Sequence, residues 1–163
     1  MCRKVRLQEA QKLPKEQLQK FYLFLKRRKL KNTSPSVISS NCNGAMILHD
    51  MKCRFNSPTV NMYFEAADFL KFLHNPQKYL SAVPQQVYSD LPYPVGKIED
   101  ITAYFMHFKS FEEAKNKWTE RSKRVDMNNL FVMMTDKNGC TYEQIAEFDA
   151  LPYKNKVIFT HKP

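Results

Sequence analysis

Residues whose side chains or backbone could carry acid–base or anion-binding chemistry stand at or near the ends of four strand-like runs in this chain. These residues are Asn41, Cys42, Asn43, Gly44, His107, Thr135, Asp136, Thr160 and His161. Ligands bind beyond the carboxyl ends of the strands in open parallel sheets, so neighbouring parallel strands would bring this group to one edge. A carboxylate, two imidazoles, a thiol and amides at one edge can transfer protons or hold a phosphate. We predict catalytic roles for Asp136, His107 and His161, and ligand binding by the others.

The segment 41–44 provides the first part of this edge. The β-branched run 36–40 predicts a strand and the apolar run 44–51 predicts a short helix, so the Asn-Cys-Asn-Gly segment forms the loop between them. A helix N-terminus presents unpaired N–H groups and a partial positive charge, and both favour anions. Asn41 and Asn43 also suit a turn or an N-cap, because asparagine side chains bind such N–H groups.

The other candidate residues have structural interpretations as well. Cys42 fits a small buried residue, whereas its place before a helix favours a reactive thiol with a lowered pKa. Asp136 opens an Asp-Lys-Asn-Gly turn, and His107 lies in an apolar run where a hydrogen-bonded core histidine is common. His161 is close to the end of the sequence. The convergence of these residues on one edge is therefore more informative than any one of them.

The elements that must position these residues alternate between strand and helix patterns. Apolar runs at 101–108 and 130–134 have the length of strands buried on both faces, a β-rich run covers 59–64, and residues 156–159 form a last strand. Helices are predicted at 65–74, from 76 to about 83, from Ser110 with a capping box to Glu113, and from Thr141 to about 150 with a capping box to Gln144. This alternation predicts an α/β fold of three layers, with a mainly parallel sheet and helices on both faces.

Composition places the chain among globular proteins. The 163 residues contain 43% hydrophobic and 13% aromatic residues, which excludes a disordered chain. Four cysteines without a Cys-x-x-Cys pair are typical of reduced thiols, so we expect a cytoplasmic protein. No apolar signal-peptide core or membrane-length apolar run is found.

Much of the net charge of +10 lies in the first 31 residues, where only Glu9 and Glu16 oppose a run of basic residues. Residues 15–31 predict a basic amphipathic helix within an N-terminal segment 1–34, which precedes a single α/β domain over 35–163. Its basic face is explained by solvation, by contact with nucleic acid, or by contact with an anionic membrane surface on the inner face of the membrane. The residues expected to contact that membrane are Lys20, Lys26, Arg27, Arg28 and Lys29.

Several known mechanisms lack their sequence motifs. The chain has no phosphate-binding G-x-x-x-x-G-K-[ST] loop, no G-x-G-x-x-G fingerprint and no H-E-x-x-H motif. Zinc-ligand spacing is also missing. The sequence therefore predicts neither a cofactor nor a metal ion. Outside the basic N-terminal helix no nucleic-acid-binding module is recognised, so nucleic acid is an unfavoured partner.

Several segments, in order along the chain, share a pattern with other proteins: residues 38–44, 55–60, 93–96, 110–115, Trp118, 134–136, 139–140 and 148–163. Through these segments, about residues 30–163 resemble a bacterial family of unknown function whose members commonly lie in capsule or exopolysaccharide gene clusters. Members of that family continue past the position of Pro163, so the resemblance implies a domain shortened at its C-terminus. It also implies a role in making or decorating surface polysaccharide.

Two functions from different classes follow from these observations. The first is a transferase that moves a sugar or another group from a phosphate-bearing donor, such as a nucleotide sugar, with the 41–44 loop holding the anionic part. The second is a non-catalytic, membrane-associated assembly factor of the polysaccharide machinery that uses the basic helix as its contact. A nucleic-acid-binding protein is a third and less favoured function.

Overall fold

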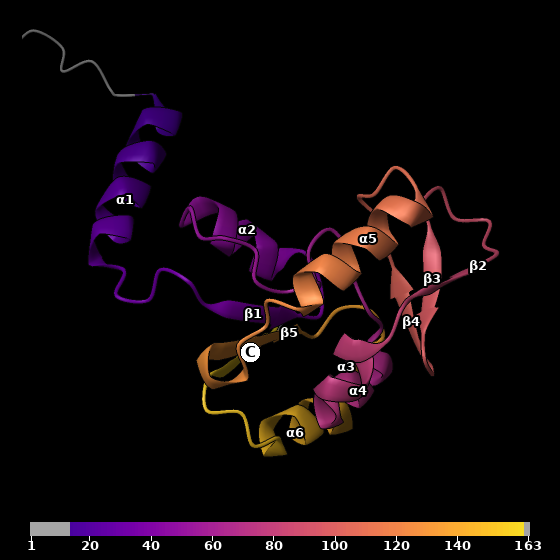
Figure 1. Ribbon diagram of the computed structural model, residues 1–163. Helices are drawn as coiled ribbons and strands as arrows, with labels where there is room; N and C mark the ends of the chain where they lie inside the picture. Colours follow the sequence, from indigo (N-terminus) through magenta and orange to yellow (C-terminus); the bar gives the residue numbers. More distant parts are fainter. Residues whose placement is uncertain (1–13, 162–163) are drawn as a thin grey trace, which may run out of the picture. The chain divides into compact units, whose positions relative to one another are not determined.

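The computed structural model describes residues 14–161, which divide into two compact units between Lys31 and Asn32 (Figure 1). The first unit contains helix α1, Lys15–Lys29, which begins after Pro14. Basic side chains occupy the last turn of α1, where they complement the negative end of the helix dipole. No residue of α1 is buried, and its exposed apolar side chains are Leu18, Phe21, Tyr22, Phe24 and Leu25.

The second unit contains a parallel sheet of three strands: β1, Ser36–Ser39; β5, Leu130–Thr135; and β6, Lys156–Phe159. The order is β1-β5-β6, so β5 lies between the other two. Ser39 pairs with Met133, and Thr135 pairs with Phe159. The strands predicted at 36–40, 130–134 and 156–159 are thus confirmed, and their carboxyl ends lie at one edge, as expected for parallel neighbours.

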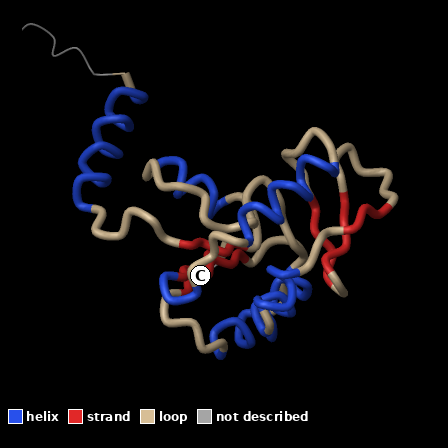
Figure 2. The backbone as a smooth tube through the Cα atoms, in the orientation of Figure 1, coloured by secondary structure: helices blue, strands red, loops and turns tan. Residues whose placement is uncertain are grey.

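A second, antiparallel sheet corrects the prediction of a mainly parallel sheet. It contains β2, Gln85–Val87, β3, Val95–Ile98, and β4, Ile101–Tyr104. Only Glu99 and Asp100 separate β3 from β4, and a parallel pairing would need a crossover of a dozen or more residues. Figure 2 shows the strands in two separate groups.

Two strand predictions were therefore wrong in detail. The run 101–108 is not one strand buried on both faces, because β4 ends at Tyr104 and alternates between buried and half-buried residues. The run 59–64 forms no ladder, and its one bridge joins Tyr63 to Tyr104. Both runs are rich in β-forming residues, but apolar composition alone does not specify a partner strand.

Five helices complete the second unit: α2, Asn43–Asp50; α3, Ala66–His74; α4, Pro76–Ser81; α5, Phe111–Ser122; and α6, Tyr142–Ala150. The capping box predicted at Thr141 and Gln144 is present in full. Ser110 also caps α5, but the Glu113 carboxylate accepts a hydrogen bond from the backbone N–H of Lys109 rather than of Ser110. A short 3₁₀ helix, Met127–Asn129, leads into β5.

Residues on the two faces of β1 and β5 belong to different apolar clusters. Val37 and Met133 pack with Leu48 of α2, whereas Ile38 and Val132 belong to the larger core. Neighbouring strand residues point to opposite faces, so both faces of these strands are covered by apolar side chains. The larger core is centred on aromatic side chains, including Phe64, Phe69, Phe72 and Trp118. It connects the parallel sheet to α3, α5 and the antiparallel sheet.

Candidate functional site

The carboxyl ends of β5 and β6 bring Asp136 and His161 into direct contact. The pairing of Thr135 with Phe159 continues in a hydrogen bond from the Asp136 N–H to the Phe159 carbonyl, at 3.1 Å. The His161 backbone N–H then lies 2.6 Å from Asp136 Oδ2, and its Nδ1 lies 2.5 Å from Oδ1. One carboxylate therefore binds both the backbone and the imidazole of the same residue.

This double contact stabilises the ionised form of the carboxylate. The His161 backbone N–H, followed by its imidazole, lowers the pKa of Asp136 from its usual value. An ionised Asp136 favours the tautomer in which His161 carries its proton on Nδ1, which leaves a lone pair on Nε2. No hydrogen bond to Nε2 is found within residues 14–161, and the side chain is 57% exposed. His161 Nε2 thus faces solvent without a described partner.

The loop between β1 and α2 lies beside this pair and is fixed by its own side chains. Asn41 donates from Nδ2 to Thr135 Oγ1 at 2.9 Å, and its Oδ1 accepts from the Asn43 N–H at 3.1 Å. Ser40 Oγ accepts from the Thr135 N–H at 3.3 Å. These bonds match the structural interpretation of Asn41 as a turn residue, and they join the loop to the residue preceding Asp136.

Gly44 lies in the first turn of α2 and packs directly on β1. Its N–H lies 3.4 Å from Ser39 Oγ. A Cβ at this position would lie 2.8 Å from Ser39 Cβ and 3.0 Å from Val37 Cγ1. Close helix–strand packing therefore explains the glycine without reference to a ligand.

Cys42 differs from the reactive thiol that its position suggested. Its Sγ lies 3.7 Å from the Met62 carbonyl oxygen. Burial raises the pKa of Cys42, and this effect exceeds the opposing hydrogen bonds from its surroundings. Of the two interpretations of Cys42, these contacts favour the small, half-buried residue, because half-burial of the side chain disfavours the thiolate more than the start of α2 favours it.

His107 and Thr160 are exposed, and neither side chain has a described contact with Asp136 or His161. His107 follows β4 of the antiparallel sheet, and its N–H donates to the Asn61 carbonyl at 3.2 Å. Among the described residues, no contact joins its side chain to Asp136 or His161. Thr160 lies between β6 and His161.

A cavity of about 390 Å³ opens beside the loop that begins at Asp136. Its lining residues are Tyr63, Glu65, Ala66, Ala67, Asn138, Gly139 and Gln144. Asn138 and Gly139 both have positive φ, at 60° and 76°, and the Ala66 N–H donates to the Asn138 carbonyl at 3.3 Å. The loop after β5 thus turns back over the start of α3 and forms a wall of the cavity.

Tyr63 forms another wall of this cavity and is backed by Tyr104. The rings of Tyr63 and Tyr104 stack at 4.6 Å, and the Tyr104 hydroxyl donates to Glu65 Oε1 at 3.1 Å. Burial raises the pKa of both tyrosines, so these hydroxyls remain protonated donors. The residues come from separate segments without a shared spacing, so no sequence pattern indicates the group.

The arrangement offers proton transfer and hydrogen bonding from side chains. Over residues 14–161, no cluster of three or more His, Cys, Asp or Glu side chains is placed to hold a metal ion. In the same range no helix has the length and apolar character needed to cross a membrane.

Comparison with known proteins identifies the family. An uncharacterized protein of Haemophilus influenzae is 51% identical over 137 residues, which cover 84% of this chain and 66% of that protein. The chain thus spans just under two thirds of the length of this relative. Neither that name nor the family description states an activity. The family model described as a domain of unknown function, DUF1919, matches residues 14–163, so the chain belongs to the DUF1919 family.

Proposed function

We propose that this protein is a group transferase of cell-surface polysaccharide biosynthesis that uses a phosphate-bearing donor such as a nucleotide sugar. The observation that carries the proposal is the Asp136–His161 pair at the carboxyl edge of the parallel sheet. The polysaccharide context is supported by the resemblance to proteins of capsule and exopolysaccharide gene clusters. The three-layer arrangement expected from the sequence belongs to the same proposal, since it would leave this edge open to ligands.

The pair supports transfer by general base catalysis. His161 Nε2 accepts the proton of an acceptor hydroxyl while Asp136 holds the Nδ1–H and stabilises the imidazolium that forms. The acceptor oxygen forms a bond to the transferred group. The bond between that group and the donor phosphate breaks, and its electron pair stays on the phosphate oxygen.

The donor phosphate is proposed to lie near the first turn of α2. The N–H groups of Asn43 and Gly44 already bind Asn41 and Ser39, but the partial positive charge of the helix end remains and favours an anion. Lys137 is exposed directly after Asp136 and adds a positive charge. Both features support a donor with an anionic leaving group at this edge.

A thermal-shift screen with nucleotide sugars, acyl donors and other phosphate compounds tests the proposal. We expect at least one donor to raise the midpoint temperature of unfolding. The protein should hydrolyse that donor slowly, with water as acceptor, and the hydrolysis rate should fall about 100-fold or more in Asp136→Asn. Asp149→Asn is the matched control, because Asp149 is an exposed aspartate on α6. The absence of any stabilising donor, or equal hydrolysis by Asp136→Asn and wild type, contradicts the transferase.

The exposed apolar side chains of α1 favour a second candidate function. Leu18, Phe21, Tyr22 and Leu25 recur at helical spacing, and the last turn is basic. A peripheral assembly factor on the inner face of the membrane would use this helix as its contact. The two functions predict different effects of mutation. If the protein is a transferase, loss of Asp136 abolishes its activity, whereas an assembly factor loses its function when α1 is removed.

A further inference from the structure

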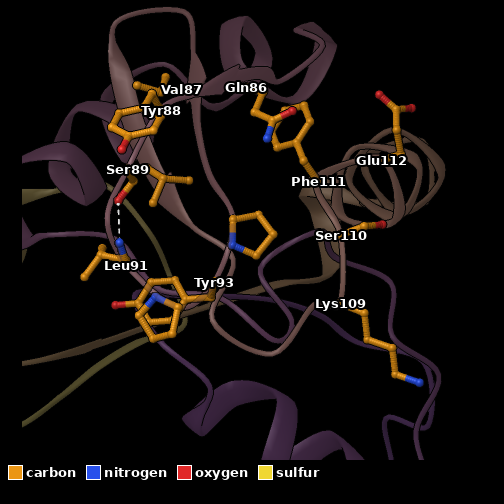
Figure 3. Close-up of a pocket in the computed structure, with 13 residues that line it drawn as sticks. Gln86, Val87, Tyr88, Ser89, Leu91, Tyr93, Lys109, Ser110, Phe111 and Glu112 are labelled. Carbon is orange, nitrogen blue, oxygen red and sulfur yellow. Dashed lines mark hydrogen bonds between the residues drawn. The ribbon is translucent and has the colours of Figure 1, made fainter.

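A second cavity, of about 600 Å³, lies between the 88–94 loop and the start of α5 (Figure 3). It is larger than the cavity beside the Asp136 loop, yet none of the sequence-predicted site residues lines it. Figure 3 shows Tyr88, Leu91 and Tyr93 on one side, with Gln86 and Phe111 opposite. This volume is in the range of cavities that bind small molecules.

The chemistry of the lining indicates a neutral ligand. Lys109 and Glu112 are the charged lining residues and their formal charges cancel. In Figure 3 both charged groups point outward, away from the aromatic side chains. The remaining lining combines aromatic, proline and aliphatic surface with the short polar side chains of Gln86, Ser89 and Ser110. A phosphate-bearing donor would find no net positive charge in this cavity.

Contacts within the protein orient the aromatic side chains that line this cavity. The Tyr88 hydroxyl donates to Asp90 Oδ1 at 2.9 Å, although the side chain is almost fully exposed. The Tyr93 hydroxyl lies 3.1 Å from the Tyr63 hydroxyl. Phe111 packs on β3 so closely that a Cβ on Gly96 would lie 2.7 Å from its ring. Fixed aromatic surfaces lower the entropy lost on binding.

Tyr63 also connects this cavity to the smaller cavity beside the loop that begins at Asp136. It lines the smaller cavity with Asn138 and Gly139, and it stacks on Tyr104. The Tyr63–Tyr93 hydrogen bond therefore joins the walls of the two cavities. A ligand in the larger cavity would lie next to Tyr93, whose hydroxyl contacts Tyr63 of the smaller cavity.

We propose that the cavity between the 88–94 loop and α5 binds a pyranose ring of a neutral carbohydrate, which serves as the acceptor in the reaction. Sugar rings present flat C–H faces that pack on aromatic rings, and hydroxyls at their edges that bind amides and serines. The assignment as acceptor rests on the proposed transferase. The carbohydrate binding rests only on the cavity.

Saturation-transfer NMR with neutral oligosaccharides of two to six glucose, galactose or mannose units tests the binding. We expect signal from ring protons with wild type, and about tenfold weaker binding with Tyr88→Ala, because one stacking surface is lost. Tyr88 is 90% exposed, so the variant should keep its fold. Tyr142→Ala removes another exposed tyrosine, at the start of α6, and should bind as wild type does.

The outcomes separate this inference from the proposed function. Asp136→Asn should retain oligosaccharide binding, since Asp136 does not line the cavity. Binding that depends on Tyr88, in a protein without donor hydrolysis, keeps the cavity assignment and rejects the transferase. Donor hydrolysis without any oligosaccharide signal, or a signal unchanged in Tyr88→Ala, overturns the carbohydrate site and leaves the transferase standing.

Discussion

Asp136 has two functions at once, which the sequence presents as alternatives. Its backbone begins the turn through Asn138 and Gly139, both with positive φ, while its carboxylate binds His161. The turn brings the chain back over α3, and the carboxylate points across to the end of β6. The structural and functional interpretations of such a residue therefore do not exclude each other.

The Asp136–His161 pair predicts a measurable titration. A carboxyl group whose pKa is lowered by folding stabilises the native state above its unfolded value of about 3.9. That stabilisation is lost as the pH falls through the lower native pKa. Carboxyl ¹³C NMR of the native protein is expected to show Asp136 titrating below pH 3.9.

His161→Ala provides the comparison for this titration. It removes the imidazole and keeps the backbone N–H, which is the larger cause of the lowered pKa. The Asp136 pKa should therefore rise in the variant but stay below its unfolded value. An Asp136 pKa at or above about 3.9 in wild type would show that the contact is absent in solution.

The Tyr63–Tyr93 hydrogen bond is predicted to couple the walls of the two cavities. Tyr63→Phe and Tyr93→Phe each remove one hydroxyl of a contact measured at 3.1 Å. Each change should lower the free energy of unfolding by about 0.5–1.5 kcal/mol. The double variant should lose less than the sum of the two, because both remove the same bond. Urea unfolding measures the stability of the two single variants and the double variant. Strictly additive losses of unfolding free energy would contradict the coupling.

At the scale of elements, the position of α2 on β1 depends on a glycine. Gly44→Ala places a Cβ 2.8 Å from Ser39 Cβ, and alanine's higher helix propensity offsets only about 1 kcal/mol of the cost. Overpacking typically costs about 1–3 kcal/mol, so we expect a net loss of stability in urea unfolding. Met46→Ala is the control on the same helix, since Met46 is 64% exposed. Equal stability of Gly44→Ala and wild type would show that α2 shifts without cost.

The parallel strands were predictable because each is a short β-forming run followed by a polar break. The antiparallel sheet was less predictable, because Glu99-Asp100 is not one of the turn sequences typical of tight hairpins, yet Glu99 adopts a φ of 55° there. The Asp136–His161 contact followed from the rule on carboxyl ends. No such rule predicts the tyrosine group, since Tyr63, Tyr93 and Tyr104 meet only through tertiary packing.

At the scale of the whole molecule, most of the net positive charge lies in the first of the two units. The first unit includes the basic last turn of α1, whereas the second includes the parallel sheet and both cavities described above. Basic residues near an anionic lipid surface contribute about 1 kcal/mol each. The apolar side chains of α1 add burial in the interface between lipid headgroups and acyl chains.

Vesicle binding is expected to depend on α1 and on anionic lipid. Replacing Lys26, Arg27, Arg28 and Lys29 by glutamine removes about 4 kcal/mol of attraction, so partition into phosphatidylserine vesicles in a sedimentation assay should fall about a thousandfold. Glutamine at four exposed lysines of the second unit (Lys52, Lys123, Lys137 and Lys154) is the control for net charge. Because the basic residues act electrostatically, neutral vesicles and high salt should also weaken binding by a similar factor. Equal losses in both variants would assign the effect to overall charge rather than to α1, and would remove the observation that favours the assembly factor.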